Sequence, residues 1–312
     1  TRDQVIKDAL SKIGAIDPTE TPSNDMIVQA ARALNLLSLS WMSKGLNIWR
    51  REEATLFMEE SNKQVYNLGP TGDHCTTEIN AVQASTTGIT AMRVAGVSTD
   101  TTLEVDSTTG MAVADNIGIL MDDNTIHWDT IAAGGITDSD TVVITTGLDA
   151  AAAIDNKVYH YTSKIQRPLR IMNLLRRDSS GIDTPIFLIS DDEYQNLSLK
   201  TSSGSVNEAY YNPTRDTNGE LHVWVTSSSV KDTIFVVYQR PFEDFDAAAD
   251  NPDFPVEWFR ALVYGLAYDL ASDYGIPLQE RALLKLDRDE ILGDAMDGDE
   301  EYGSVYFGVQ TR

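Results

Sequence analysis

The sequence predicts an α+β protein in which a helical-bundle core carries a small β-sheet part and an inserted all-β module, a barrel or a sandwich. Three observations predict this class. Apolar residues recur every three or four positions near both ends of the chain, which is typical of amphipathic helices. Residues 84–162 are rich in Thr, Val, Ile and Asp, with turn residues at short spacing. Short alternating runs elsewhere indicate a few further strands.

Two helices are predicted in the N-terminal quarter. Each has one apolar stripe: Val5, Ile6, Ala9, Leu10 and Ile13 in the first, and Met26, Ala30, Leu34, Leu37 and Trp41 in the second.

A third helix is predicted between Pro255 and Gly275. Proline suits the first turn of a helix, and glycine commonly ends one. A last helix is expected over residues 278–296. We expect the core of the bundle to be packed by large apolar side chains from these helices: Trp41, Trp258, Phe259, Leu262, Leu266 and Leu270.

The segment that follows the β module contains a helix start and two strands. Ser190 with Glu193 forms a capping-box pattern that opens a short helix. The runs 221–226 and 233–239 are predicted to pair as a hairpin. The predicted domains are therefore a first part of the core at 1–83, the β module at 84–162, a second part of the core at 163–296, and an extended arm at 297–312.

The charge is strongly acidic. The 48 Asp and Glu residues against 24 Lys and Arg residues give a net charge of −24. Sequence-specific nucleic-acid binding needs a basic face, so this class of function is disfavoured. An acidic surface can keep a protein soluble, or it can let DNA pass without adhering. No apolar run is long enough to span a membrane.

The usual catalytic motifs are missing from the sequence: there is no phosphate loop, no GxSxG, no HExxH and no paired CxxC. His74 and Cys75 are neighbours, but adjacent residues of an extended chain point to opposite faces. The other histidines, His127, His160 and His222, are expected as strand residues. Pairs of carboxylates are frequent in so acidic a chain, so they do not point to any particular catalytic site. We therefore expect no catalytic residue, no metal site and no cofactor.

An ordered set of motifs outside residues 84–162 resembles the head-to-tail adaptor proteins of short-tailed bacteriophages, also called tail accessory factors, packaged-DNA stabilisation proteins or tail tubular proteins A. Each motif is weak alone, and their order and spacing carry the resemblance. In chain order, the motifs are 41–49, 66–70, 189–194, 210–211, 221–224, 238–245 and 251–258.

The resemblance implies a structural protein of the virion. It implies a ring of about twelve copies that connects the portal protein to the tail nozzle or tail tube, extends the DNA channel and helps retain the packaged genome. Double-stranded DNA would pass without sequence-specific binding, and tail fibres are a further expected contact. The protein would assemble in the host cytoplasm and reside in the virion.

Two surfaces follow from this expectation. The arm after residue 297 would bind the portal through apolar and aromatic anchors: Tyr302, Val305, Tyr306, Phe307 and Val309. An acidic loop would face a neighbouring subunit or the channel: Glu243, Asp244, Asp246, Asp250 and Asp253. Two alternatives stay open, a cell-wall hydrolase that uses paired carboxylates and a tail component whose β module binds the host surface.

Overall fold

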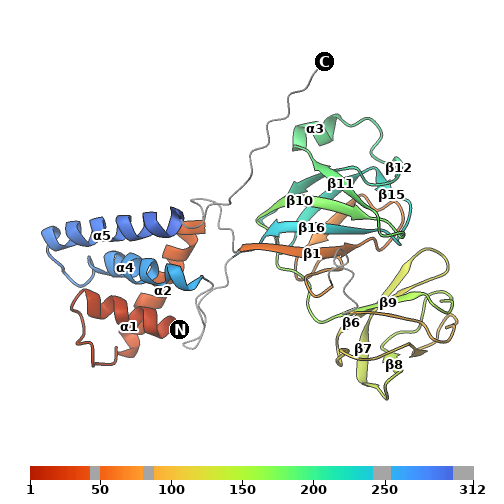
Figure 1. Cartoon of the computed structure of the whole chain (residues 1–312), viewed down its shortest axis with the longest axis horizontal. Helices are drawn as coiled ribbons and strands as arrows, with labels where there is room; N and C mark the ends of the chain where they lie inside the picture. Colours follow the sequence, from red (N-terminus) through yellow and green to blue (C-terminus); the bar gives the residue numbers. More distant parts are fainter. Residues whose placement is uncertain (43–49, 80–87, 242–253, 298–312) are drawn as a thin grey trace. The chain divides into compact units, whose positions relative to one another are not determined.

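The computed structural model describes residues 1–42, 50–79, 88–241 and 254–297. The chain folds as two compact units. One combines Thr1–Arg50 with Phe242–Arg312, and we call it the helical unit. The other is Arg51–Pro241, which we call the β unit (Figure 1).

The described helical unit consists of helices from both ends of the chain. They are α1 (Arg2–Lys12), α2 (Asn24–Met42), the 3₁₀ turn η2 (Val256–Trp258), α4 (Phe259–Leu270) and α5 (Leu278–Asp297). Helix α4 is central, because it packs against α1, α2 and α5. At Gly265 a side-chain Cβ would come within 2.8 Å of Leu37, so the glycine lets α2 and α4 approach closely.

The core of the helical unit is apolar. Val5, Leu10 and Leu34 are fully buried together with Leu262 and Leu266 of α4. Their positions follow the three-and-four spacing of the sequence, so each helix turns one stripe inward. Burial of each such side chain stabilises the fold by about 1.5–3 kcal/mol before conformational entropy is counted.

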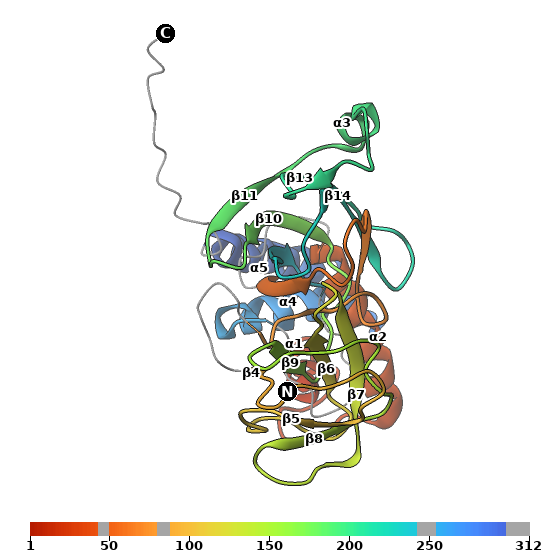
Figure 2. The same cartoon turned by 90° about the vertical axis from the view of Figure 1, so that its right-hand side faces the viewer.

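The β unit contains an eight-stranded sheet that curls into a nearly closed barrel. Its strand order is β2-β14-β13-β11-β10-β16-β1-β3. The strands are β1 (Arg51–Phe57), β2 (Val65–Leu68), β3 (Cys75–Thr76), β10 (Arg170–Arg177), β11 (Asp183–Leu188), β13 (Glu208–Asn212), β14 (Gly219–Trp224) and β16 (Thr233–Gln239). A short pair, β12 (Ser203–Gly204) with β15 (Thr226–Ser227), and helix α3 (Asp191–Asn196) complete this part, and Figure 2 shows α3 beyond β13 and β14.

Pairing between distant segments builds the barrel. Strand β1 pairs with β16 along its whole length, from Arg51 opposite Gln239 to Phe57 opposite Thr233. The strands at the two ends of this sheet, β2 and β3, are joined by a short loop. In this loop the Asp73 amide donates a hydrogen bond to the Asn67 carbonyl of β2 at 2.7 Å. Closing a sheet in this way leaves few free edges for other chains to pair with.

The remaining strands form a six-stranded sheet with the order β4-β9-β6-β7-β8-β5. They are β4 (Ile89–Ala91), β5 (Thr102–Glu104), β6 (Asn116–Leu120), β7 (Ile126–Ile136), β8 (Thr141–Ile144) and β9 (Lys157–Tyr161). A buried cluster joins this sheet to the barrel: Phe57 of β1 lies 5.2 Å from the Trp128 ring and 4.7 Å from the Tyr159 ring, between ring centroids.

The expected helical-bundle core is wrong as a description of the protein. The structure is mostly β, with about 31% strand and 26% helix, and its main element is the barrel-like sheet. The segments 51–76 and 170–239, which the sequence assigned to a small sheet beside a bundle, pair with each other to form the barrel. Periodicity indicates whether a segment is a strand, but it does not show which distant strand that segment pairs with, so the sequence pattern alone does not reveal the size of the sheet.

The predicted hairpin of 221–226 with 233–239 is also wrong. Strand β14 pairs with β13 and β2, whereas β16 pairs with β1 and β10. The short helix after Ser190 is confirmed. The Ser190 hydroxyl accepts from the Glu193 amide, and the Glu193 carboxylate accepts from the Ser190 amide at 2.8 Å.

Candidate functional site

The residues expected to pack the helices lie in the core of the helical unit. Trp41, Trp258, Leu262, Leu266 and Leu270 are buried there, and Phe259 packs against the same cluster while remaining partly exposed. The indole rings of Trp41 and Trp258 meet edge to face with centroids 5.7 Å apart. Such aromatic pairs add about 0.5–1.5 kcal/mol beyond the burial of their area.

The two expected interaction surfaces lie outside the described residues. The residues expected to bind the portal are Tyr302, Val305, Tyr306, Phe307 and Val309, and those expected to face a neighbouring subunit or the channel are Glu243, Asp244, Asp246, Asp250 and Asp253.

His74 and Cys75 take part in different packing clusters. The Cys75 side chain lies in the barrel core, where burial raises the pKa of its thiol. The His74 ring stacks on Trp128 at 3.8 Å and shares a 2.5 Å hydrogen bond with the Tyr161 hydroxyl. Burial, helped by the charges of Lys164 and Lys63, lowers the pKa of His74 from 6.5 to about 3. A protonated thiol and a neutral imidazole that face different clusters do not form a nucleophile and its base.

The other histidines are strand residues, as expected. His127 lies in β7, His160 in β9 and His222 in β14. His127 is buried, and its Nδ1 lies 2.6 Å from Asp149 Oδ2. His222 packs beside Tyr194 and Tyr210. His160 lines a pocket.

This pocket has a volume of about 460 Å³ and lies beside β4 and β9; we call it the β4–β9 pocket. Its lining includes hydroxyl, carboxylate and imidazole groups: Glu78, Thr90, Thr109, Asp115, His160 and Thr162. Gly88 forms part of the wall, where its carbonyl accepts from the His160 amide at 2.8 Å. The φ of Gly88 is +76°, and a Cβ there would come within 2.7 Å of the His160 carbonyl, so a larger residue would not fit.

The two carboxylates of the pocket are held by hydrogen bonds. Glu78 accepts from the amides of Thr162 and Ser163, both at 2.8 Å, and from the Ser163 hydroxyl. Desolvation opposes the charged form of Glu78, but these hydrogen bonds outweigh it and lower its pKa. Asp115 accepts from the Thr162 hydroxyl at 2.9 Å and from the Ala112 amide at 2.7 Å. Glu78 is therefore ionised at neutral pH.

His160 is 6% exposed, and within the described residues its ring makes no hydrogen bond. Burial lowers the pKa of His160, against the opposite effect of Asp115 and Glu78. The imidazole is therefore neutral near pH 7, with one nitrogen that donates and one that accepts.

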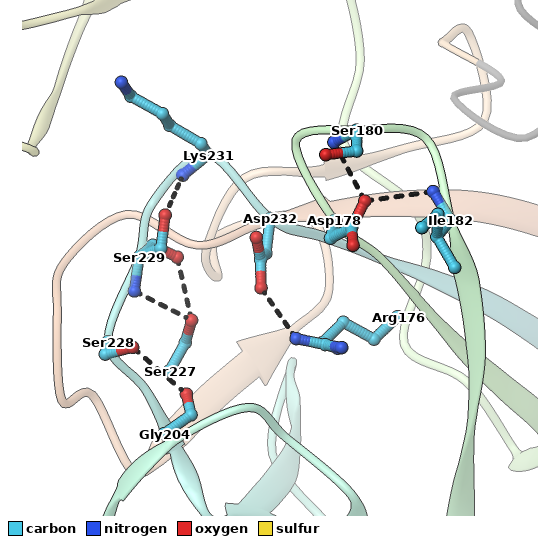
Figure 3. A network of polar contacts seen from close by, with 10 residues as sticks. All are labelled: Arg176, Asp178, Ser180, Ile182, Gly204, Ser227, Ser228, Ser229, Lys231 and Asp232. Atoms are coloured by element: carbon cyan, nitrogen blue, oxygen red, sulfur yellow. Dashed lines mark hydrogen bonds and ion pairs between the residues drawn. The ribbon is translucent and has the colours of Figure 1, made fainter.

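A second polar network lies where β10 and β16 meet the turns that flank them (Figure 3). Arg176 Nη1 lies 3.1 Å from Asp232 Oδ2, and burial raises the pKa of Asp232 although Arg176 opposes the change. Asp178 accepts from the amides of Ser180 and Ile182 and closes the turn between β10 and β11. These contacts connect strands and turns within the barrel, so we interpret the network as structural.

The helical unit exposes apolar side chains on two helices. On α2, Val28, Leu36 and Leu39 are 62%, 60% and 48% exposed, and spacings of eight and three put them on one face. On α5, Leu283 and Leu286 are 64% and 65% exposed and lie three residues apart. The inner face of α5 packs on α4, so these leucines point away from the core.

Among the residues that the structure describes, no three His, Cys, Asp or Glu side chains gather closely enough to hold a metal ion. No helix in the described ranges is long and apolar enough to cross a membrane.

The comparison with protein-family models found no match to the chain, and the comparison with curated proteins found none either.

The sequence did not indicate the β4–β9 pocket. Glu78, Asp115 and His160 come from three segments that are well separated along the chain, and only the folded sheet brings them together. The one available signal was the density of Thr and Asp in residues 84–162, which predicted turns and strands but no particular site.

Proposed function

We propose that the chain is a structural subunit of a bacteriophage virion, which forms a ring between the portal protein and the tail nozzle and extends the DNA channel. The ordered motifs of the sequence support this proposal. The structural observation that carries it is the exposure of two apolar helical faces, one on α2 and one on α5. Apolar faces of this kind mark sites of protein association.

Two different faces suit a ring better than a two-fold dimer. In a closed ring, one face of each copy contacts a different face of the next copy. Helices α2 and α5 offer such a pair, because each packs on α4 and leaves its own apolar side chains exposed. An interface through Leu36 of one copy and Leu286 of the next would bury side chains that are exposed in the single chain.

The charge supports the same function. At −24 per copy, a ring presents many carboxylates, and those facing a channel would repel DNA phosphates. A genome could then slide through the channel without adhering.

Electron microscopy of the full chain mixed with the portal protein of the same genome tests the proposal. We expect a collar of about twelve copies beneath the portal. The double variant Leu283→Ser with Leu286→Ser should reduce the number of decorated portals, because it removes the apolar face of α5. Lys285→Ser is the matched control on the same helix and should leave decoration unchanged.

A portal that stays bare with the unaltered chain would contradict the proposal. A collar that forms equally well with the double variant would retain the ring but reject α5 as its interface.

A further inference from the structure

The β4–β9 pocket contains hydrogen-bonding groups that the described residues leave unused. The Thr90 hydroxyl accepts from the Ser107 amide at 3.2 Å, and the Thr109 hydroxyl accepts from the Ser107 hydroxyl at 2.9 Å. Within the described chain, neither threonine donates its own proton. Both line the pocket, so each can donate to a bound molecule.

His160 is the strongest indication of a ligand. An imidazole that faces a pocket and has no protein partner can form its hydrogen bonds with water or with a ligand. The His160 residue as a whole is 6% exposed, its ring lines the pocket, and the ring has no hydrogen-bond partner among the described residues. As a neutral imidazole it offers one donor and one acceptor, and a ligand hydroxyl can satisfy either.

The charges limit what this ligand can be. Glu78 and Asp115 would repel an anion from a pocket with no cationic side chain in its described lining. A cation would need free carboxylate oxygens, but Glu78 already accepts three hydrogen bonds and Asp115 accepts two. The acceptor capacity that remains on each carboxylate can take a hydrogen bond from a ligand hydroxyl.

The shape and the walls agree with a sugar. A pocket of about 460 Å³ lies within the range of small-molecule sites, about 300–1,000 Å³. Apolar surface also makes up part of the lining, and the C–H groups of a sugar ring can contact it.

We propose that the β4–β9 pocket binds a small uncharged saccharide, whose hydroxyls donate to Asp115 and Glu78 and exchange hydrogen bonds with His160, Thr90 and Thr109. This site is independent of ring assembly, because all of these residues lie in the β unit. It would give the protein a recognition function beside its structural one.

Titration of the full chain with D-glucose, D-galactose and N-acetyl-D-glucosamine, followed by saturation-transfer NMR, tests the proposal. We expect at least one of these neutral sugars to bind, with a dissociation constant near the millimolar range. Thr90→Val should weaken binding about three- to tenfold, the effect of one hydrogen bond, and Thr90→Ser should retain it. His160→Leu should weaken binding at least as much.

The matched control is Thr102→Val, at an exposed position on β5 of the same sheet, and its affinity should equal that of the unaltered chain. If His160→Leu fails to fold, the Thr90 pair still decides the result. Absence of binding by all three sugars would overturn the proposal, as would equal affinity of the Thr90→Val variant. Tighter binding of spermidine or of N-acetylneuraminic acid than of any neutral sugar would also overturn it, because the pocket would then select a charge.

Discussion

The two units of this protein differ in where they keep their polar and apolar groups. The helical unit has an apolar core and leaves leucines exposed on α2 and α5. The β unit buries polar groups such as Thr55, Asp115 and His160 within its sheets. An exposed apolar face favours association with another protein, whereas a buried polar group with free hydrogen-bonding capacity favours recognition of a small ligand.

The units also differ in how far their contacts reach along the chain. Within each helix, the backbone hydrogen bonds form between residues four apart, and only the burial of the apolar stripe depends on packing against other helices. The backbone hydrogen bonds of the barrel strands join residues that are far apart in the sequence, such as the pair Arg51 and Gln239. We therefore expect the units to respond separately to core substitutions and to pH.

The largest expected effect is on the core of the helical unit. Leu262 is fully buried on α4, so Leu262→Ala should lower the free energy of unfolding of this unit by about 2–5 kcal/mol. Hydrogen exchange measured by mass spectrometry should show faster exchange in α1, α4 and α5, with the barrel strands unchanged. Leu283→Ala is the matched control. Because Leu283 is exposed, this substitution should change the free energy of unfolding little. Equal acceleration in β1 and β16 would show that the two units unfold together.

A smaller effect is expected from pH, which should change the stability of the β unit more than that of the helical unit. All the histidines of the chain, His74, His127, His160 and His222, lie in the β unit. The pKa of His74 is about 3 in the folded protein and 6.5 in an exposed chain, so below pH 6.5 the unfolded state binds a proton that the folded state does not. Stability of the β unit should therefore be intact above pH 6.5 and fall by up to about 1.4 kcal/mol per pH unit below it.

Thermal melts between pH 7.5 and about pH 5, where most carboxylates are still ionised, measure this dependence. His74→Gln should flatten the pH dependence, although it should also lower the stability at pH 7.5 through loss of the stacking on Trp128. Thr102→Val, which changes an exposed and non-titrating residue of the same unit, is the control and should keep the slope of the unaltered chain. An unchanged slope in His74→Gln would assign the pH dependence to other groups.

The smallest expected effect is local to α3. Ser190→Ala removes the hydroxyl that accepts from the Glu193 amide and should destabilise this short helix by about 1 kcal/mol. Amide exchange in α3 should accelerate while that of β10 and β16 does not, and Ser190→Thr should restore protection. Unaltered exchange in Ser190→Ala would mean that packing on β13 alone holds the helix.

Features with a local cause were predictable from the sequence. The inward stripes of α1, α2 and α4 follow from spacing, and the start of α3 follows from Ser190 and Glu193. The strand positions of His127, His160 and His222 follow from alternating runs. In each case the residues that determine the structure lie within one element.

Features that depend on distant pairing were not predictable. The hairpin expected from two neighbouring runs does not form, because β16 lies between β1 and β10 instead. The β4–β9 pocket was not predictable for the same reason. Glu78 accepts hydrogen bonds from Thr162 and Ser163, which follow it by more than eighty residues in the sequence. In so acidic a sequence, a carboxylate that lines a pocket cannot be told from the others until its hydrogen-bond donors are known.

The amino-acid sequence alone was enough to locate the described helices and several of the strands, the apolar stripe of each helix, and a net charge that disfavours specific DNA binding. Three further features depend on the folded chain: the near closure of the strands into a barrel, the exposure of leucines on α2 and α5, and the placement of a neutral histidine and two carboxylates in one pocket. The physical reason is the range of the interactions. Side-chain periodicity and capping act over a few residues, whereas sheet pairing and burial depend on segments that meet only in the folded chain.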